Sequence, residues 1–262
     1  MATHKLLVMT DDMVPGYLSL NEGRLLNGLA SMLPPSSLCV EIGTFCGKST
    51  RWLTVGTLIS DSGLYCIDPF TSELGVETKA NPTSLLNRFF EQDTLGVAMW
   101  SLLKLFNEPA MLQHVEFYRG TSKAAEKAWL GEGIDLLFID GNHEECQEDV
   151  DRWLSHVQPW GMLAFHDVTT TKSYGVNGPI NTVQRLLATR QWRVYAQTES
   201  LVCLTRDSEW WAVRGDATYD RYTAGFPRDA QRSSETTRDA HTHGDLSVRY
   251  GDQSLDVGRE GV

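Results

Sequence analysis

The stretch VEIGTFCGKST, residues 40–50, restricts the possible folds of this chain more than any other. An apolar run there contains an acid, Glu41, and a turn with two glycines leads into a helical pattern over residues 48–59. A buried strand, a glycine turn and a helix in succession are the first unit of a doubly wound α/β sheet. Glycine lets the backbone turn sharply and come close to a ligand. The stretch therefore predicts an α/β domain that binds a ligand at the end of its first strand.

Further strands and helices alternate along the chain. Apolar runs typical of strands occupy residues 38–42, 64–67, 115–118, 135–139 and 161–165. Two more runs, residues 192–197 and 200–205, are close enough in sequence to pair as an antiparallel hairpin. One of the helices between the strands is expected to have an apolar face of Val150, Trp153, Leu154 and Val157. This order predicts a Rossmann-like, doubly wound sheet of five parallel strands with a C-terminal antiparallel hairpin.

Three regions are expected from the changes in composition. Residues 1–36 form an N-terminal helical segment, whose helix begins at a Ser-Leu-Asn-Glu capping box near residue 19. Residues 37–205 hold the α/β domain, with a helical insertion at about 71–113. The insertion is long for a crossover and is expected to form a lid or a dimer surface. Residues 206–262 are a polar tail of mixed charge.

The charge and the cysteines exclude several classes of protein. The 23 basic and 34 acidic residues give a net charge of −11, whereas binding to nucleic acid needs a basic face. No apolar run approaches the length of a membrane span. The five cysteines form no CxxC pair and indicate reduced thiols without a zinc site; they are Cys39, Cys46, Cys66, Cys146 and Cys203. We therefore expect a soluble cytoplasmic protein with no nucleic-acid or membrane partner.

The Gly-Lys-Ser-Thr sequence at residues 47–50 raises one alternative, a P-loop that binds a nucleoside triphosphate. A P-loop has four residues between its two glycines. Only three residues separate Gly43 from Gly47, so the loop is one residue short. The stretch DLLFID at residues 135–140 does resemble the strand and aspartate of a nucleotide triphosphatase. A P-loop-type sugar kinase or nucleotide triphosphatase therefore stays open as an alternative.

A second interpretation places a nucleoside cofactor with an amino-acid part in the same loop. Asp68 ends the second predicted strand, where an acid accepts hydrogen bonds from ribose hydroxyls. Ser122 is a polar group at the start of the helix that follows the third strand. Glu41 favours S-adenosylmethionine over a dinucleotide, because an acid can face the cationic amino-acid part and would repel a pyrophosphate.

Five motifs together resemble one family. They are VEIGTFCGKST, YCIDPF, RGTS, LLFIDGNHE and WGMLAFHDV, within roughly residues 20–205. In this order they are similar to the class I S-adenosylmethionine-dependent methyltransferases, and among these to the metal-dependent sugar O-methyltransferases of the macrocin O-methyltransferase type. The resemblance implies the class I methyltransferase fold and methylation of a hydroxyl of a sugar or oligosaccharide, as in polysaccharide biosynthesis. It also implies a divalent metal ion, with Mg²⁺ expected, and a homodimer.

The resemblance assigns the cofactor to eight residues. They are Glu41, Gly43 and Gly47 for the methionine part, Ser49 in the same motif, Asp68 for the ribose, Thr121 and Ser122 for the adenine, and Asp140 beside the cofactor. The implied metal ligands are Asp140, His166 and Asp167. The implied general base is His143, three positions after Asp140, so that these two residues carry the catalysis.

Three positions depart from the family's pattern, and one of them is Trp160-Gly161, where relatives usually have Gly-Gly before the fifth strand. His166 is a softer ligand than the carboxylates and amides that Mg²⁺ prefers. Either His166 contacts the metal ligands without binding the ion itself, or the site accepts manganese or another transition ion. Glu145 stands where relatives often have an aromatic residue, and it is a candidate for a further ligand or a substrate contact.

These residue types suit methyl transfer to an alcohol. A bound divalent ion lowers the pKa of a hydroxyl and orients it. Histidine titrates in the useful range and can take the proton. Two related alternatives are a module that binds the cofactor without catalysis, and a family member that supports hydroxylation in a partner complex.

Overall fold

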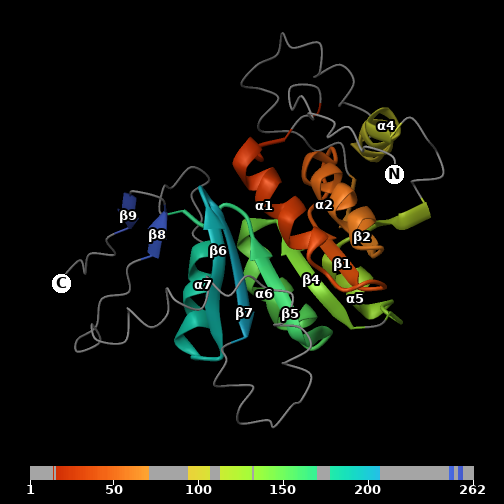
Figure 1. Ribbon diagram of the computed structural model, residues 1–262. Coiled ribbons are helices and arrows are strands. Elements are labelled where there is room, and N and C mark those ends of the chain that lie inside the picture. The colour runs from red at the N-terminus through yellow and green to blue at the C-terminus, as the bar shows by residue number, and fades with distance from the viewer. Residues whose placement is uncertain are drawn as a thin grey trace, which may run out of the picture.

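A seven-stranded sheet runs through the centre of the protein in the order β3-β2-β1-β4-β5-β7-β6 (Figure 1). Its strands are β1 (Leu38–Ile42), β2 (Gly63–Asp68), β3 (Val115–Arg119), β4 (Ile134–Ile139), β5 (Val157–Phe165), β6 (Trp192–Thr198) and β7 (Leu201–Arg206). The structure is a computed structural model, and it describes residues 14, 16–70, 94–106, 113–131, 133–169, 178–206, 248–250 and 253–255.

The directions of the strands confirm the predicted sheet. β1 to β5 run parallel to one another, whereas β7 is antiparallel to both β5 and β6. The hairpin has β7, and not β6, next to β5. Residues 201–204 of β7 are fully buried, while most of β6 is half-buried. The more apolar strand therefore takes the inner position and the more polar strand forms the edge.

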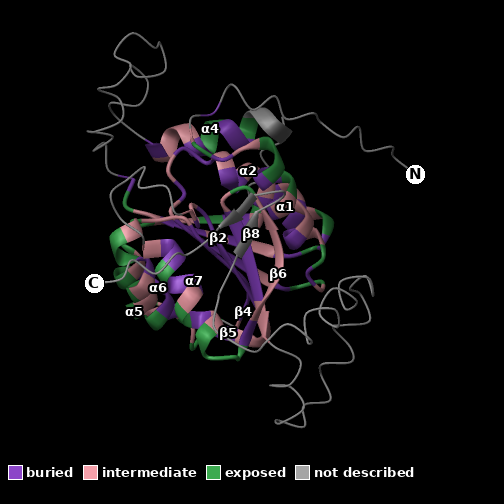
Figure 2. Cartoon of the chain, turned by 90° about the vertical axis from the view of Figure 1, so that its left-hand side faces the viewer, coloured by how far each residue is buried: buried purple, intermediate pink, exposed green. Residues whose placement is uncertain are grey.

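Helices cover both faces of the sheet (Figures 1 and 2). One layer consists of α1 (Leu20–Ser31), α2 (Lys48–Ile59) and α4 (Thr94–Phe106); the other consists of α5 (Ser122–Lys127), α6 (Cys146–Trp153) and α7 (Gly178–Ala188). Leu26 and Leu53 belong to one buried cluster with Phe138, and Trp153 belongs to a second cluster with Leu137. Because successive side chains of a strand point to opposite faces, one strand supplies both cores.

The helix predicted around Trp153 is shorter than expected. α6 ends at Trp153, so Leu154 and Val157 are not part of its apolar face. Val157 instead begins β5, which starts before the predicted residue 161, and it pairs with Ile134 of β4. The proline at residue 159 disfavours helical backbone at the residue before it, which keeps this segment extended.

Parts of the expected insertion and tail lie outside the described residues. Within the insertion the structure describes α4, and residues 71–93 and 107–112 lie outside it. In the tail, β8 (Val248–Tyr250) and β9 (Gln253–Leu255) pair as a separate two-stranded sheet. None of the helices in the described ranges combines the length and the apolar character needed to cross a bilayer.

Glu41 is buried beneath the glycine turn and connects β1 to α2. Ser49 Oγ donates a hydrogen bond to one of its carboxylate oxygens at 2.5 Å, and Thr50 Oγ1 donates to the other at 2.6 Å. Burial raises the pKa of Glu41 to about 7, although these hydroxyl groups favour the charged form. The acid predicted to face the cofactor therefore holds the first turn of α2 against β1.

Glu41→Gln should change how stability depends on pH. The pKa of Glu41 is about 7 in the folded protein against an ordinary value of 4.5. Between these values the folded protein keeps a proton that the unfolded chain releases, so this group lowers stability as pH rises through the window. Relative to the variant, the parent should lose roughly 3 kcal/mol of unfolding free energy across that window. Urea denaturation at several pH values measures the difference, and parallel stability curves would contradict the shift.

The helices α1 and α2 approach closely at Gly56. α1 begins with the predicted capping box, in which Ser19 and Glu22 bond each other's backbone. A Cβ atom at Gly56 would lie 2.5 Å from the Cβ of Ala30 and 2.7 Å from the carbonyl oxygen of Asn27. Such distances leave no room for a methyl group between the two helices.

Gly56→Ala should lower the unfolding free energy by about 1–3 kcal/mol, because the added methyl group forces the helices apart. Gly28→Ala is the matched control, since a Cβ atom at Gly28 in α1 meets nothing within 4 Å. This control should raise the unfolding free energy by about 0.5–1 kcal/mol, because alanine favours the helix. Both values come from urea denaturation, and a stabilising Gly56→Ala would disprove the close contact.

Candidate active site

A cavity of about 640 Å³ opens where β1, β2, β4 and β5 end. The predicted site residues that line it are Gly43, Ser49, Asp68, Thr121, Ser122, Asp140, His143, His166 and Asp167. The two others lie behind its wall. Glu41 is buried below the turn, and Gly47 packs on α4, where a Cβ atom would lie 3.0 Å from the Cα of Ala98. The carboxyl ends of parallel strands share one edge, which brings these distant residues together.

The turn after β1 depends on Gly43 and Asp68. Gly43 has a φ of 94°, and a Cβ atom there would lie 2.2 Å from the carbonyl oxygen of Asp140, so the position requires glycine. Asp68 accepts hydrogen bonds from the N–H groups of Phe45 at 2.9 Å and Phe70 at 2.6 Å. Burial raises the pKa of Asp68, and these N–H groups oppose the shift. Since each carboxylate oxygen can accept a further hydrogen bond, Asp68 is suited to ribose hydroxyls.

Asp149 is a residue of the cavity wall that the sequence analysis did not identify. It lies on α6, is buried, and accepts a hydrogen bond from Ser122 Oγ at 2.6 Å. Ser122 Oγ also accepts one from Trp153 Nε1 at 2.9 Å. The hydroxyl proton of Ser122 is therefore already used within the protein, and Thr121 caps α5 by accepting from the N–H of Ala124. The sequence could have indicated Asp149 because it stands four residues before Trp153, which puts both side chains on the same face of the helix.

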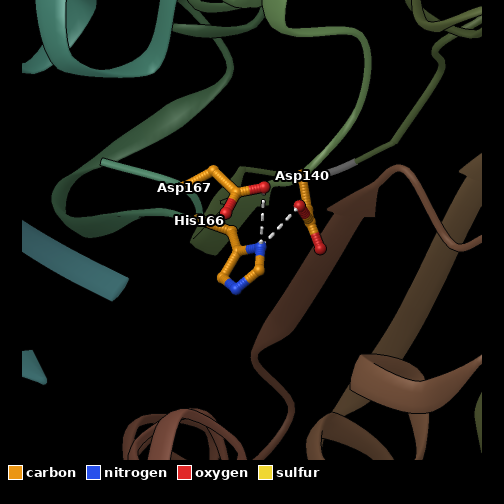
Figure 3. A group of neighbouring side chains, drawn as sticks. All are labelled: Asp140, His166 and Asp167. Atoms are coloured by element: carbon orange, nitrogen blue, oxygen red, sulfur yellow. Dashed lines mark hydrogen bonds and ion pairs between the residues drawn. The ribbon is translucent and has the colours of Figure 1, made fainter. Parts of the chain in front are cut away.

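Asp140, His166 and Asp167 point toward one another at the ends of β4 and β5 (Figure 3). His166 Nδ1 lies 3.0 Å from Asp140 Oδ1 and 3.5 Å from Asp167 Oδ2. Asp167 has a left-handed φ of 53°, which is uncommon outside glycine and often marks a functional position. His143, on the short helix η4 (His143–Glu145), places Nε2 3.2 Å from Asp167 Oδ2. The structure thus brings the predicted base and the predicted metal ligands into one group.

Glu22 of α1 contacts this group from the buried side. Its Oε2 lies 3.2 Å from His166 Nε2, and its side chain is only 4% exposed. Its Oε1 accepts hydrogen bonds from the N–H of Ser200 at 3.0 Å and from Ser200 Oγ at 2.6 Å. The sequence pattern indicated a helix cap at Glu22, and no signal in it pointed to a histidine so far along the chain.

His166 balances the charge of the carboxylates around it. Burial opposes a charge on its ring, but Asp140, Asp167 and Glu22 outweigh burial and hold the pKa of His166 well above its usual range. Burial also opposes the charge of Glu22, yet the hydrogen bond and the charge of His166 contribute to lowering the pKa of Glu22 to about 2. Burial raises the pKa of Asp140, and His166 opposes the shift. The proton on His166 therefore gives this cluster a positive charge that offsets its carboxylates.

The donor atoms of the cluster fit a divalent metal ion. One ligand atom each of Asp140, His166 and Asp167 lies within 4.8 Å of the other two. Carboxylate oxygens suit hard ions, and an imidazole nitrogen suits Mn²⁺ and later transition ions better than Mg²⁺. A histidine ligand is neutral, so Nδ1 of His166 would release its proton to the solvent on binding.

Three solved structures share the fold of this chain. An O-methyltransferase from Bacillus cereus in complex with SAH is 17% identical, with a TM-score of 0.54 over 77% of this chain and 94% of that one. The O-methyltransferase TomG from Streptomyces achromogenes, involved in tomaymycin synthesis and solved with SAM, is 18% identical, with a TM-score of 0.52 over 73% and 82%. The SAH-bound methyltransferase PaMTH1 from Podospora anserina is 14% identical, with a TM-score of 0.52 over 75% and 81%. Because these sequence identities are low, the structural similarity establishes the fold alone and not the activity.

A family model matches the central part of the chain. The model, described as a methyltransferase domain, matches residues 40–168. The matched span begins in β1 and ends just after Asp167, so it includes the glycine turn and Asp140, whereas α1 with Glu22 lies outside it. The sheet order and the residues at the strand ends agree with the match. Residues 40–168 of the chain therefore match a methyltransferase domain.

Proposed function

We propose that this chain is an S-adenosylmethionine-dependent O-methyltransferase that methylates a sugar or oligosaccharide hydroxyl with the help of a divalent metal ion and a histidine base. One observation carries the proposal: His143 and the Asp140, His166 and Asp167 cluster line the same cavity as the glycine turn and Asp68. A base, an ion site and a cofactor turn within one cavity are what methyl transfer to an alcohol requires.

The cavity favours a cationic cofactor over a nucleoside triphosphate. Carboxylates such as Asp68 and Asp140 line it, and they attract a sulfonium and an ammonium group but repel phosphates. Within the turn, the N–H of Phe45 donates to Asp68 and the N–H of Gly47 donates to the carbonyl oxygen of Thr44. A P-loop needs its N–H groups for phosphate. These contacts therefore speak against a kinase or nucleotide triphosphatase.

The proposed division of roles follows position in the cavity. The methionine part would lie against Gly43 and Ser49, the ribose against Asp68, and the adenine near Thr121, Ser122 and the buried Asp149. Asp140 lies between the cofactor turn and the ion site, because a Cβ atom at Gly43 would touch its carbonyl oxygen. The reacting sulfur and the acceptor would thus meet at the end of β4.

The chain's own residues would move the proton. When bound, a divalent ion lowers the pKa of the acceptor hydroxyl, and Asp140, His166 and Asp167 are the residues proposed to hold it. His143 accepts the hydroxyl proton, and the carboxylate of Asp167, 3.2 Å from Nε2, stabilises the imidazolium that forms. The methyl carbon then passes in line to the alkoxide oxygen as its bond to sulfur breaks, which leaves S-adenosylhomocysteine.

The sugar acceptor rests on the family resemblance and on polar groups in the cavity wall. Asn142, Glu144 and Glu145 line the cavity and offer amide and carboxylate groups to hydroxyls. Mg²⁺ as the ion, the homodimer and the cytoplasmic location stay predictions of the sequence analysis.

The proposal predicts methyl transfer that depends on a divalent ion. The purified protein should transfer the labelled methyl group of S-adenosylmethionine to a sugar acceptor with Mn²⁺ or Mg²⁺, and transfer should stop in excess chelator. The acceptor should gain the mass of one CH₂ group. A gain of one oxygen would indicate support of hydroxylation instead, and full transfer in chelator would remove the metal from the mechanism.

His143→Gln should lower turnover by about 10²–10⁴-fold, the usual contribution of a general base, while the affinity for S-adenosylhomocysteine stays unchanged. His156→Gln is the matched control, because His156 pairs with Glu126 at 3.2 Å, the same distance as in the His143–Asp167 pair, but lies outside the cavity. Steady-state kinetics and calorimetry measure the two effects. If His143→Gln turns over like the parent, the base lies elsewhere.

A further inference from the structure

Glu22 contacts the site from outside the residues that match the methyltransferase domain and outside the five family motifs. It lies on α1, before the matched residues 40–168, yet its carboxylate reaches His166 at the end of β5. An inference about Glu22 rests on the proposed ion site, because it concerns how one ligand of that site is held.

The contacts of Glu22 go beyond those of a helix cap. In a capping box the acid needs to reach only the backbone N–H of the N-cap residue, and Glu22 Oε2 does so at Ser19, 2.9 Å away. The same oxygen faces His166 Nε2 at 3.2 Å, while Oε1 accepts two hydrogen bonds from Ser200. A buried carboxylate with four such contacts is fixed in position and stays charged.

These contacts decide which nitrogen of His166 faces the ion site. Nε2 points at Glu22, and Nδ1 points at Asp140 and Asp167. The two ring nitrogens of a histidine are distinct, and the partner of one sets the role of the other. A carboxylate that accepts the N–H of one nitrogen directs the lone pair of the other toward a metal ion.

We propose that Glu22 is a positioning residue of the ion site: by holding the proton of His166 on Nε2, it makes Nδ1 a ligand for Mn²⁺ or a similar transition ion. α1 therefore contributes to the site without reaching the cavity with this side chain. Ser200, in the turn between β6 and β7, keeps the carboxylate of Glu22 from rotating away.

Three variants of the full chain separate this role from simpler ones. In Glu22→Gln an amide nitrogen in the place of Oε2 can donate to Nε2 and drive the proton to Nδ1, but it no longer accepts the N–H of Ser19, so the variant also weakens the cap. Ser19→Ala is the control for a weakened cap: it removes the hydroxyl that accepts the N–H of Glu22 and leaves the carboxylate at His166. Glu126→Gln changes a half-buried acid that pairs with a histidine, His156, at the same 3.2 Å and away from the cavity.

Two measurements report on ion binding and do not depend on turnover. Calorimetric titration with Mn²⁺ gives its affinity for each variant. Electron spin echo envelope modulation on protein labelled with [¹⁵N]histidine shows whether an imidazole nitrogen is bound to Mn²⁺. Glu22→Gln should weaken Mn²⁺ binding by about 10–100-fold, as loss of a residue behind a ligand does, and should reduce the nitrogen signal. Ser19→Ala and Glu126→Gln should bind Mn²⁺ like the parent, with the same signal.

Three results would overturn the inference while leaving methyl transfer in place. They are parent-like binding and signal in Glu22→Gln, equal weakening in Ser19→Ala, and Mn²⁺ bound to the parent with no nitrogen signal. A parent that binds neither Mn²⁺ nor Mg²⁺, with methyl transfer intact in chelator, would overturn the metal part of the proposed function and the role of Glu22 together. Titration with S-adenosylhomocysteine, expected to be unchanged in all variants, shows that each protein is folded.

Discussion

Parallel strands end at the same edge of a sheet, and this constraint decides where the chemistry of this protein can lie. The order of the sheet gathers Asp68, Asp140 and Asp167 around one cavity, although the sequence separates them widely. Carboxylates at a partly buried edge are costly unless each is hydrogen-bonded or paired with a charge. Backbone N–H groups of two turns satisfy Asp68, hydroxyl groups of α2 satisfy the buried Glu41, and the ring of His166 lies between the other two acids. The turns and the histidine therefore serve the same purpose, which is to hydrogen-bond or neutralise the carboxylates at this edge of the sheet.

The same acids favour a positively charged ligand in the cavity. A sulfonium cofactor and a divalent ion each bring positive charge to a region of carboxylates, whereas a triphosphate brings more negative charge. His166 supplies a positive charge in the protein itself, and its proton is the one that an ion would replace. Glu22 extends this arrangement beyond the methyltransferase domain, because it ties α1 and the turn between β6 and β7 to the ring of His166. The N-terminal helix is in this way part of the site and not only a cover for one face of the sheet.

The sequence predicted most of the sheet because its strands are continuous apolar runs bounded by turns. β1 and β4 are buried on both faces, so their patterns are unambiguous. The inner place of β7 could not be predicted, since it depends on competition between two strands of similar pattern for one buried position. The end of α6 was wrong because Val157 suits a helix face and a buried strand equally well. Periodicity also shows that an acid such as Glu22 or Asp149 is on the inner face of a helix, but not which distant group it meets there.

The measurement that tests the central claim most directly is calorimetric titration of the full-length protein with S-adenosylmethionine and, separately, with Mg-ATP. Saturable binding of S-adenosylmethionine and no heat from Mg-ATP is the expected result, because the N–H groups of the glycine turn are engaged within the protein and the cavity wall is acidic. Binding of Mg-ATP alone would mean that the turn holds phosphates, and every role proposed for the residues of the cavity would have to be withdrawn.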